Sequence, residues 1–215
     1  MNPAVSLYPI IDTALCRTRG VDPFALAVAC LRGGARLLQI RAKDEGGAAL
    51  LALTERVVAA AASEAGGLVI VDDRADIARM AGAGGVHVGQ TDLPVAAARA
   101  IVGAGAIVGL STHNRQQIDD ALASDANYVA VGPVFLTASK DTGYTPRGLD
   151  LVRYAAGRGK PIVAIGGITL ERAPEVVAAG AAALAVISDI LVGDDAEARV
   201  RAFHARLPPQ PFKVY

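Results

Sequence analysis

The 215-residue sequence holds only two cysteines and three histidines. Cys16 and Cys30 give neither a disulfide framework nor a clustered zinc-ligand spacing, so we expect both thiols to be reduced and structural. The spacing of His87, His113 and His204 suits no metal cluster, and His204 falls on a predicted outer helix. A zinc site is therefore not expected.

Neither sign of charge is in excess, because Lys and Arg total 21 and Asp and Glu also total 21. A balanced chain has no overall positive field with which to hold nucleic acid or an anionic membrane. The sequence also lacks an apolar run of membrane-spanning length and an apolar start with a basic flank. We therefore expect a cytoplasmic protein with no nucleic-acid or membrane partner, in which any anion site is built locally.

Apolar residues are abundant, at 53 % of the chain, against 20 % charged residues. Short apolar runs alternate with longer Ala-rich amphipathic stretches, such as residues 50–62, which is the rhythm of β/α units. The eight runs are LYPIID from Leu7, LLQIRAK from Leu37, LVIVDD from Leu68, GVHVG from Gly85, IVGLSTH from Ile107, YVAVGPVF from Tyr128, PIVAIGG from Pro161 and ALAVIS from Ala183.

Eight near-regular units without a composition break predict an α/β protein with a single (β/α)₈ TIM barrel. The whole chain is then one domain, with the barrel over about residues 5–207 and a proline-broken tail at 208–215. Glycine-containing turns before strands, as in RGGARLLQI and AAGAAALAVIS, support one repeated architecture, because a helix often ends on a left-handed glycine. An open doubly wound sheet is the alternative.

The reacting groups of such barrels lie at the C-terminal ends of the strands and in the loops that follow. Gln39, Arg41 and Lys43 are spaced two apart at the end of the second run, so they project to one side of the strand. Two cations side by side in a barrel mouth indicate an anion. The alternative is that Arg41 and Lys43 only pair with acids on neighbouring strands.

Carboxylates follow the next two runs, in VDDRAD and HVGQTD. Asp73 and Asp92, beside a basic pair, suggest Mg²⁺ bridging to a diphosphate, because Mg²⁺ is commonly held by one or two carboxylates together with substrate oxygens. The alternative for Asp72, Asp73 and Asp76 is capping of the helix that follows, and we expect one of the three to do this.

Polar groups also occur within the fourth run, at the end of the fifth and in the loop after the sixth. His87 is equally compatible with a satisfied imidazole inside the barrel and with a substrate contact, while Ser111 is a small donor at the active face. The sixth run enters GPVFLTASKDTGYTPRG, a long loop of the kind that often clamps a ligand. Thr137, Ser139 and Lys140 suit a phosphate there, and a merely solvated loop is the alternative.

After the seventh run, Gly166 and Gly167 let a ligand approach the main chain closely, and VISD follows the eighth. Loops seven and eight commonly form the phosphate pocket of this fold, although glycines can also serve packing alone. The sequence thus predicts two anion sites, a diphosphate with Mg²⁺ at strands two to four and a monophosphate at strands seven and eight, for small phosphorylated molecules.

Seven motifs in order, LQIRAKD, VDDRADIA, GVHVGQTD, GLSTH, YVAVGPVFLTASK, PIVAIGGI and AVIS, resemble those of the thiamine phosphate synthase family. The resemblance spans residues 7 to about 207. It implies a transferase that joins hydroxymethylpyrimidine diphosphate to hydroxyethylthiazole phosphate, giving thiamine phosphate and diphosphate by a dissociative, Mg²⁺-dependent reaction. It also suggests a homodimer.

The resemblance implies a role for each matching residue. Those around the diphosphate would be Arg41, Lys43, Ser111 and Lys140 as catalytic groups, Asp72 beside them, and Asp73 and Asp92 as metal ligands. Gln39 would contact the pyrimidine, and the thiazole phosphate would be held by Thr137, Ser139, Gly167, Ile187 and Ser188. Asp72 departs from the family, which usually has Asn there. We expect Asp72→Asn to leave turnover intact or improved.

Three other readings compete. Thiazole tautomerases of the same superfamily carry His where GPVF has Pro133, and a proline cannot move protons. A non-catalytic barrel that binds thiamine intermediates would not need the complete charged set. A sugar-phosphate isomerase or an indole-forming lyase would have no reason for paired aspartates beside a basic pair.

Overall fold

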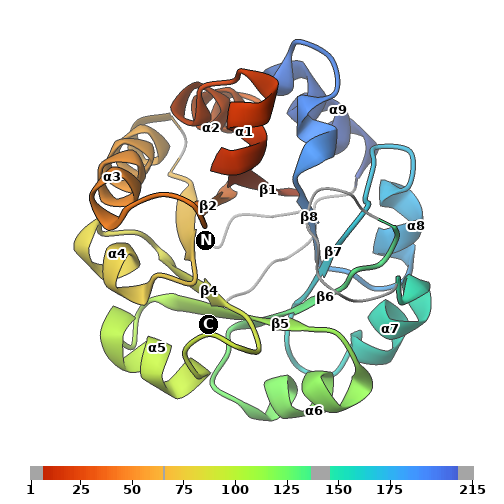
Figure 1. Cartoon of the computed structure of the whole chain (residues 1–215). Coiled ribbons are helices and arrows are strands. Elements are labelled where there is room, and N and C mark those ends of the chain that lie inside the picture. The colour runs from red at the N-terminus through yellow and green to blue at the C-terminus, as the bar shows by residue number, and fades with distance from the viewer. Residues whose placement is uncertain (1–6, 65, 137–145, 208–215) are drawn as a thin grey trace.

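The computed structural model describes residues 7–64, 66–136 and 146–207. Eight parallel strands form a closed barrel in sequence order, and helices surround it (Figure 1). The predicted (β/α)₈ barrel is confirmed, and the open doubly wound sheet is wrong because the first strand pairs with the last, Leu7 with Leu184.

The strands lie where the apolar runs predicted them, each starting within one residue of its run. They are β1 (Leu7–Asp12), β2 (Leu37–Arg41), β3 (Leu68–Asp72), β4 (Gly85–Val88), β5 (Ile107–Thr112), β6 (Tyr128–Val131), β7 (Ile162–Ile165) and β8 (Ala183–Val186).

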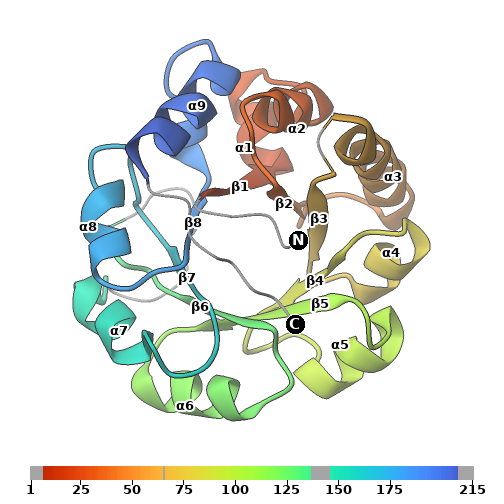
Figure 2. The ribbon, with the colours of Figure 1, turned by 180° about the vertical axis from the view of Figure 1, so that it is seen from behind.

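The helices cover the outside of the barrel, and α9 packs beside α2 in both views (Figures 1 and 2). They are α1 (Thr13–Arg19), α2 (Pro23–Arg32), α3 (Gly47–Glu64), α4 (Ala75–Met80), α5 (Val95–Val102), α6 (Arg115–Ala123), α7 (Gly148–Ala155), α8 (Ala173–Ala178), the 3₁₀ helix η1 (Ser188–Leu191) and α9 (Ala196–Arg206). No helix in these described ranges is both long and apolar enough to span a membrane.

Side chains alternate across the barrel wall, as the two-residue period of a strand requires. Leu37 and Ile70 belong to a buried cluster inside the barrel, whereas Leu38 and Val69 belong to the larger cluster between strands and helices. Both faces of the sheet are therefore apolar along most of their length, and the polar groups collect at the strand ends.

Glycines end several of the helices in the way that the sequence predicted. Gly34, Gly82 and Gly180 follow α2, α4 and α8 and have φ values of 104°, 65° and 103°. This left-handed backbone costs a glycine little and reverses the chain toward the next strand. The turns bring each new strand back to the N-terminal end of the barrel, so the opposite end is left for the longer loops.

Candidate active site

The last residues of β1, β2 and β3 are Asp12, Arg41 and Asp72, and all three lie at the C-terminal mouth of the barrel. Register places Asp12 opposite Arg41, and the loops that follow add Lys43 and Asp73. Charged side chains that are far apart in the sequence therefore meet at one edge of the sheet.

These five residues form a continuous set of ion pairs, called here the charged cluster. Arg41 hydrogen-bonds to the Asp12 carboxylate, and its Nε lies 3.5 Å from Asp72 Oδ2. The Lys43 ammonium lies 3.8 Å from the same Asp72 oxygen and pairs directly with Asp73. The side chains of Asp12 and Asp72 are 4 % and 7 % exposed, and that of Lys43 is 41 % exposed, so the cluster runs from the buried wall to solvent.

Arg41 and Lys43 are thus paired with acids on neighbouring strands, as the structural alternative predicted. Three carboxylates and two cations leave one negative charge in excess, and a repulsive excess of this kind is relieved by a divalent cation. The donor set therefore suits an anion that arrives together with a metal better than a bare anion.

Asp12 was not among the predicted site residues. Its Oδ1 accepts a hydrogen bond of 2.9 Å from the Leu15 amide and so caps α1, while its Oδ2 holds Arg41. The signal was available, because LYPIID ends the first strand in an acid just as LQIR ends the second in a base.

Asp73 and Asp92, the predicted metal ligands, both follow strand ends. Asp73 has a φ of 59°, the single positive value among the described non-glycine residues, and such backbone strain is characteristic of functional sites. Asp92 is not part of the charged cluster; its Oδ2 accepts a hydrogen bond of 2.8 Å from the Gly89 amide. Among the described residues, no three His, Cys, Asp or Glu side chains gather as a metal-binding group.

The expected capping of the helix after β3 is wrong in its detail. The N-cap of α4 is Arg74, which makes no side-chain cap hydrogen bond. Asp76 lies in the first turn instead, where the hydrogen bond from Arg74 holds its pKa at about 2. Asp72 and Asp73 are thereby left to the mouth of the barrel.

The contacts of His87 are those of a satisfied imidazole inside the barrel, which is one of the two predicted alternatives. It lies inside the barrel with 7 % of its surface exposed, and its Nε2 lies 2.8 Å from Ser111 Oγ. Its Nδ1 lies 2.9 Å from the hydroxyl of Tyr128, which in turn meets the hydroxyl of Tyr8 at 3.1 Å. Gln39 Nε2 donates to Tyr8 at 3.1 Å. Two predicted site residues on opposite walls, Gln39 and Ser111, are thus connected through the interior.

The other two histidines lie away from this interior. His113 Nδ1 is 2.8 Å from the Gly132 carbonyl oxygen, beyond the end of β5. His204 lies on α9, as predicted, and burial lowers its pKa from 6.5.

The predicted phosphate residues Thr137, Ser139 and Lys140 lie outside the described residues. Gly166 and Gly167 have φ values of 102° and 63°, and both pack tightly against the segment that leaves β6. A Cβ on Gly166 would lie 2.7 Å from the Pro133 Cα. The packing alternative therefore explains these glycines on its own, and their role toward a phosphate stays a prediction.

After β8, the 3₁₀ helix η1 begins at Ser188, with Ile187 at its N-cap. Asp189, which is 6 % exposed, accepts a 3.0 Å hydrogen bond from the Leu170 amide and pairs with Arg199 at 2.7 Å. One buried carboxylate thus ties the loop after β7 to the loop after β8. The two loops that the sequence assigned to a monophosphate are held together.

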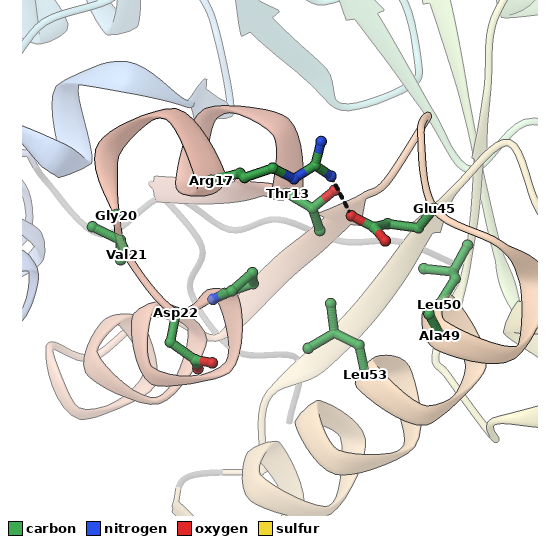
Figure 3. A pocket seen from close by; sticks show the side chains of 10 residues that line it. Thr13, Arg17, Gly20, Val21, Asp22, Glu45, Ala49, Leu50 and Leu53 are labelled. Carbon is green, nitrogen blue, oxygen red and sulfur yellow. Dashed lines mark hydrogen bonds and ion pairs between the residues drawn. The ribbon is translucent and has the colours of Figure 1, made fainter.

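A pocket of about 530 Å³ lies on the outer side of the mouth, between α1, α2 and the start of α3 (Figure 3). Arg17 and Glu45, 2.5 Å apart, cross one side of it, and Leu50 and Leu53 line another. Of the predicted site residues that the structure describes, none lines this pocket. The Arg17–Glu45 ion pair connects α1 to the loop that carries Lys43, and the pocket is separate from the candidate site.

Comparison with known proteins gives a consistent result. The family model described as thiamine monophosphate synthase matches residues 7–190. A thiamine-phosphate synthase of Anaeromyxobacter dehalogenans is 44 % identical over 86 % of this chain and 83 % of its own, and one of Mycolicibacterium smegmatis is 41 % identical over 94 % and 92 %. The solved thiamine phosphate pyrophosphorylase of Pyrococcus furiosus is 27 % identical, covers 95 % of this chain and 96 % of its own, and superposes with a TM-score of 0.84.

The barrel, the order of the strand-end motifs and these relatives agree over most of the chain, so the predicted family is confirmed. The chain belongs to the thiamine monophosphate synthase family, a family of transferase enzymes.

Proposed function

We propose that the protein joins hydroxymethylpyrimidine diphosphate to hydroxyethylthiazole phosphate, forming thiamine phosphate and diphosphate, with Mg²⁺ as the required metal. The observation that carries the proposal is the charged cluster at the ends of β1, β2 and β3. Membership of the family and the names of its relatives support the same reaction.

In the proposed reaction, the bond between the pyrimidine methylene carbon and the diphosphate oxygen breaks, and diphosphate leaves with the electron pair. The ring amine stabilises the pyrimidine-methyl cation until the thiazole nitrogen donates its lone pair and forms the new carbon–nitrogen bond. The thiazolium gains the positive charge that balances the departing anion. Such chemistry needs positioning and charge stabilisation, and no protein nucleophile.

The residues of the charged cluster, together with Asp92 from the loop after β4, have separate tasks in this proposal. Arg41 and Lys43 bind the leaving diphosphate, and Asp73 and Asp92 supply the hard oxygen ligands that suit Mg²⁺. The metal, when bound, neutralises diphosphate charge as a Lewis acid. Arg41 is held in place by Asp12, so its guanidinium is oriented before the substrate arrives. Lys43 is more exposed than Arg41, so its ammonium would be accessible to the phosphate oxygens, and Asp73, its present partner, would be one of the residues that hold the metal.

The remaining predicted residues contact the pyrimidine diphosphate or bind the thiazole phosphate. Gln39 and Ser111 face the pyrimidine and its diphosphate, and Lys140 completes the diphosphate site. Gly167, Ile187 and Ser188 bind the thiazole phosphate together with Thr137 and Ser139. The loops after β7 and β8, joined through Asp189, form the second anion site. A cytoplasmic location and a homodimer remain part of the same proposal.

The test is a diphosphate-release assay with both substrates, in the presence and absence of Mg²⁺, with the organic product identified by mass. We expect thiamine phosphate only when both substrates and the metal are present. Arg41→Gln should lower kcat/KM at least tenfold, about 1.4 kcal/mol. Arg153→Gln, which removes an exposed arginine paired with Asp150 on α7, is the matched control and should keep full activity.

Other outcomes would point to the competing readings. Isomerisation of a thiazole carboxylate without condensation would indicate the tautomerase. Tight binding of both substrates with no product would indicate a non-catalytic barrel. Condensation that proceeds equally well with a chelator present would remove the metal from the proposal while keeping the reaction.

A further inference from the structure

We propose that Gln39, Tyr8, Tyr128, His87 and Ser111 form one hydrogen-bond chain with a single direction. The chain holds His87 as the neutral tautomer with its proton on Nε2. It also leaves the Ser111 hydroxyl as a donor toward the barrel mouth. In this arrangement Tyr8, Tyr128 and His87 are positioning residues. The consequence for catalysis rests on the proposed function. The existence and direction of the hydrogen-bond chain do not depend on it.

The geometry is continuous across the interior of the barrel. Its four contacts measure 3.1 Å from Gln39 Nε2 to Tyr8 Oη, 3.1 Å between the phenol oxygens, 2.9 Å from Tyr128 to His87 Nδ1 and 2.8 Å from His87 Nε2 to Ser111 Oγ. All lie within hydrogen-bond range. Gln39, Tyr8, Tyr128 and His87 are 3 %, 1 %, 0 % and 7 % exposed, so water cannot readily replace the three links among these four side chains.

The direction follows from counting hydrogens. Each phenol carries one hydrogen. Tyr8 accepts from the Gln39 amide nitrogen. Its own hydrogen is assigned, in the proposed direction, to the Tyr128 oxygen 3.1 Å away, a contact in which either phenol can donate. Tyr128 then gives its hydrogen to Nδ1 of His87, which must present a lone pair there. A neutral imidazole with a bare Nδ1 carries its proton on Nε2, and that proton is donated to Ser111.

The ionisation of the phenols is consistent with this count. Burial raises the pKa of both Tyr8 and Tyr128 above the usual range for tyrosine, and the nearby Asp72 carboxylate raises both further. Both hydroxyls therefore keep their hydrogens at neutral pH. A chain that lost one of them would no longer have a defined direction.

The barrel wall is shaped to hold the central ring. Gly109 on β5 lies opposite both His87 and Tyr128 in the register, and a methyl group at that position would overlap the Tyr128 phenol. The Tyr128 ring stacks on His87 with centroids 5.5 Å apart and an interplanar angle of 17°, and it meets Tyr8 edge to face at 6.1 Å. The aromatic side chains of this hydrogen-bond chain are thus fixed by packing as well as by hydrogen bonds.

At the barrel mouth, the hydrogen-bond chain fixes the direction of the Ser111 hydroxyl. Its oxygen accepts from His87, and its main-chain carbonyl accepts from Gln90 Nε2 at 2.6 Å, so both ends of the residue are held. The hydroxyl hydrogen is left to point away from His87. It can donate to an acceptor on the substrate, such as a ring nitrogen or a diphosphate oxygen, and it rejects a donor at the same place.

The direct test is the tautomer of His87 in the folded protein. Long-range ¹H–¹⁵N correlation of protein labelled in histidine separates a protonated ring nitrogen from a bare one. Variants His113→Gln and His204→Gln identify the signals of the other two histidines, which are not part of the hydrogen-bond chain. We expect the Nε2–H tautomer for His87 at neutral pH. The Nδ1–H tautomer or a charged ring would overturn the proposal.

Variants that break the chain test its continuity. Tyr128→Phe removes the donor to Nδ1, and Tyr8→Phe removes the link before it while leaving the ring in place. Tyr154→Phe is the matched control, because its hydroxyl binds Asp119 on the outside of the barrel. Tyr128→Phe should shift His87 toward a mixture of tautomers, whereas Tyr154→Phe should leave the spectrum unchanged. If Tyr128→Phe folds and keeps the tautomer, the proposed direction is wrong.

The effect of the hydrogen-bond chain on activity is tested by a double-mutant cycle of kcat between Tyr8→Phe and Ser111→Ala. We expect Tyr8→Phe to lower kcat about fivefold in the wild type and less than about twofold when Ser111 is already alanine. An equal loss in both backgrounds would show that the chain does not act through Ser111. If the wild type forms no thiamine phosphate, the proposed function fails, and the NMR result still decides whether the chain exists.

Discussion

Asp12 shows how one carboxylate can serve two elements of the mouth. Its two oxygens face different partners, the Leu15 amide at the start of α1 and the Arg41 guanidinium at the end of β2. Because the side chain is almost fully buried, a charge there is tolerated only while both contacts are made. The position of Arg41 is therefore tied to the folding of the first helix.

Asp12→Asn separates the two tasks, because asparagine still caps a helix but carries no charge. We expect a loss of about 3 kcal/mol in unfolding free energy, since Arg41 loses a buried partner. We also expect kcat/KM to fall about tenfold. Urea titration and steady-state kinetics measure the two effects. Asp22→Asn, at the exposed N-cap of α2, is the control and should change neither quantity by much.

Asp72, like Asp12, can be replaced by asparagine, which removes the charge and keeps the shape of the side chain. It lies between Arg41 and Lys43 and competes with an incoming anion for both. Asp72→Asn should leave turnover intact or improved, lower the KM for the diphosphate substrate, and reduce the Mg²⁺ requirement only slightly. A large loss of turnover in a magnesium titration would contradict this expectation.

At the scale of elements, the strands were predictable and the helix ends were less so. Each apolar run is short, buried on both faces and bounded by turn residues, and this pattern is not shared by the helices. Helix starts depend on which of several polar residues caps them. VDDRAD offered three aspartates, and Arg74 took the N-cap position of α4.

The candidate site shows the same division. Residues at strand ends were predictable, because the fold alone gathers Arg41, Lys43 and Asp73 at one mouth. The link through Tyr8 and Tyr128 was not, because it joins β1 to β6 across the barrel and leaves no local pattern in the sequence. A search for polar side chains at inward-facing strand positions would have found both tyrosines.

Gly109 provides a prediction about the packing of β5. Gly109→Ala should destabilise the protein by about 1–3 kcal/mol, because the added methyl displaces the buried Tyr128 ring. Gly105→Ala, in the turn before the same strand, meets nothing within 4 Å and is the control. Thermal unfolding of both variants measures the difference. Equal unfolding midpoints for the two variants would show that β5 and the Tyr128 ring can move apart at Gly109 without loss of stability.

His204 makes a prediction about α9. Burial, with a smaller effect of Arg36, lowers the pKa of His204 from 6.5, so the folded protein prefers the neutral ring. The unfolded chain then binds the proton more readily, and stability falls as the pH drops below about 6.5. Urea midpoints from about pH 7.5 to about pH 5.5 should fall less for His204→Gln than for the wild type. Parallel curves for the two proteins would contradict this.

At the scale of the whole molecule, the two free cysteines report on global opening. Cys16 and Cys30 are fully buried, and burial raises their thiol pKa values to about 11 and about 12. Native protein should react with a thiol reagent only as fast as it unfolds, and both sites should react together. Labelling followed by mass spectrometry, with urea-unfolded protein as the reference, measures this. Rapid labelling of one cysteine alone would indicate local opening near α1 or α2.

The seam at which the barrel closes has a consequence for synthesis of the chain. β8, at residues 183–186, completes the sheet by pairing with β1, the strand of the barrel that is synthesised first. Until then β1 has an open edge, which can pair with another chain. The charged cluster would already be assembled on β1 to β3 while the loops after β7 and β8 are still missing. A nascent chain would thus hold half of its proposed site long before it could bind both substrates.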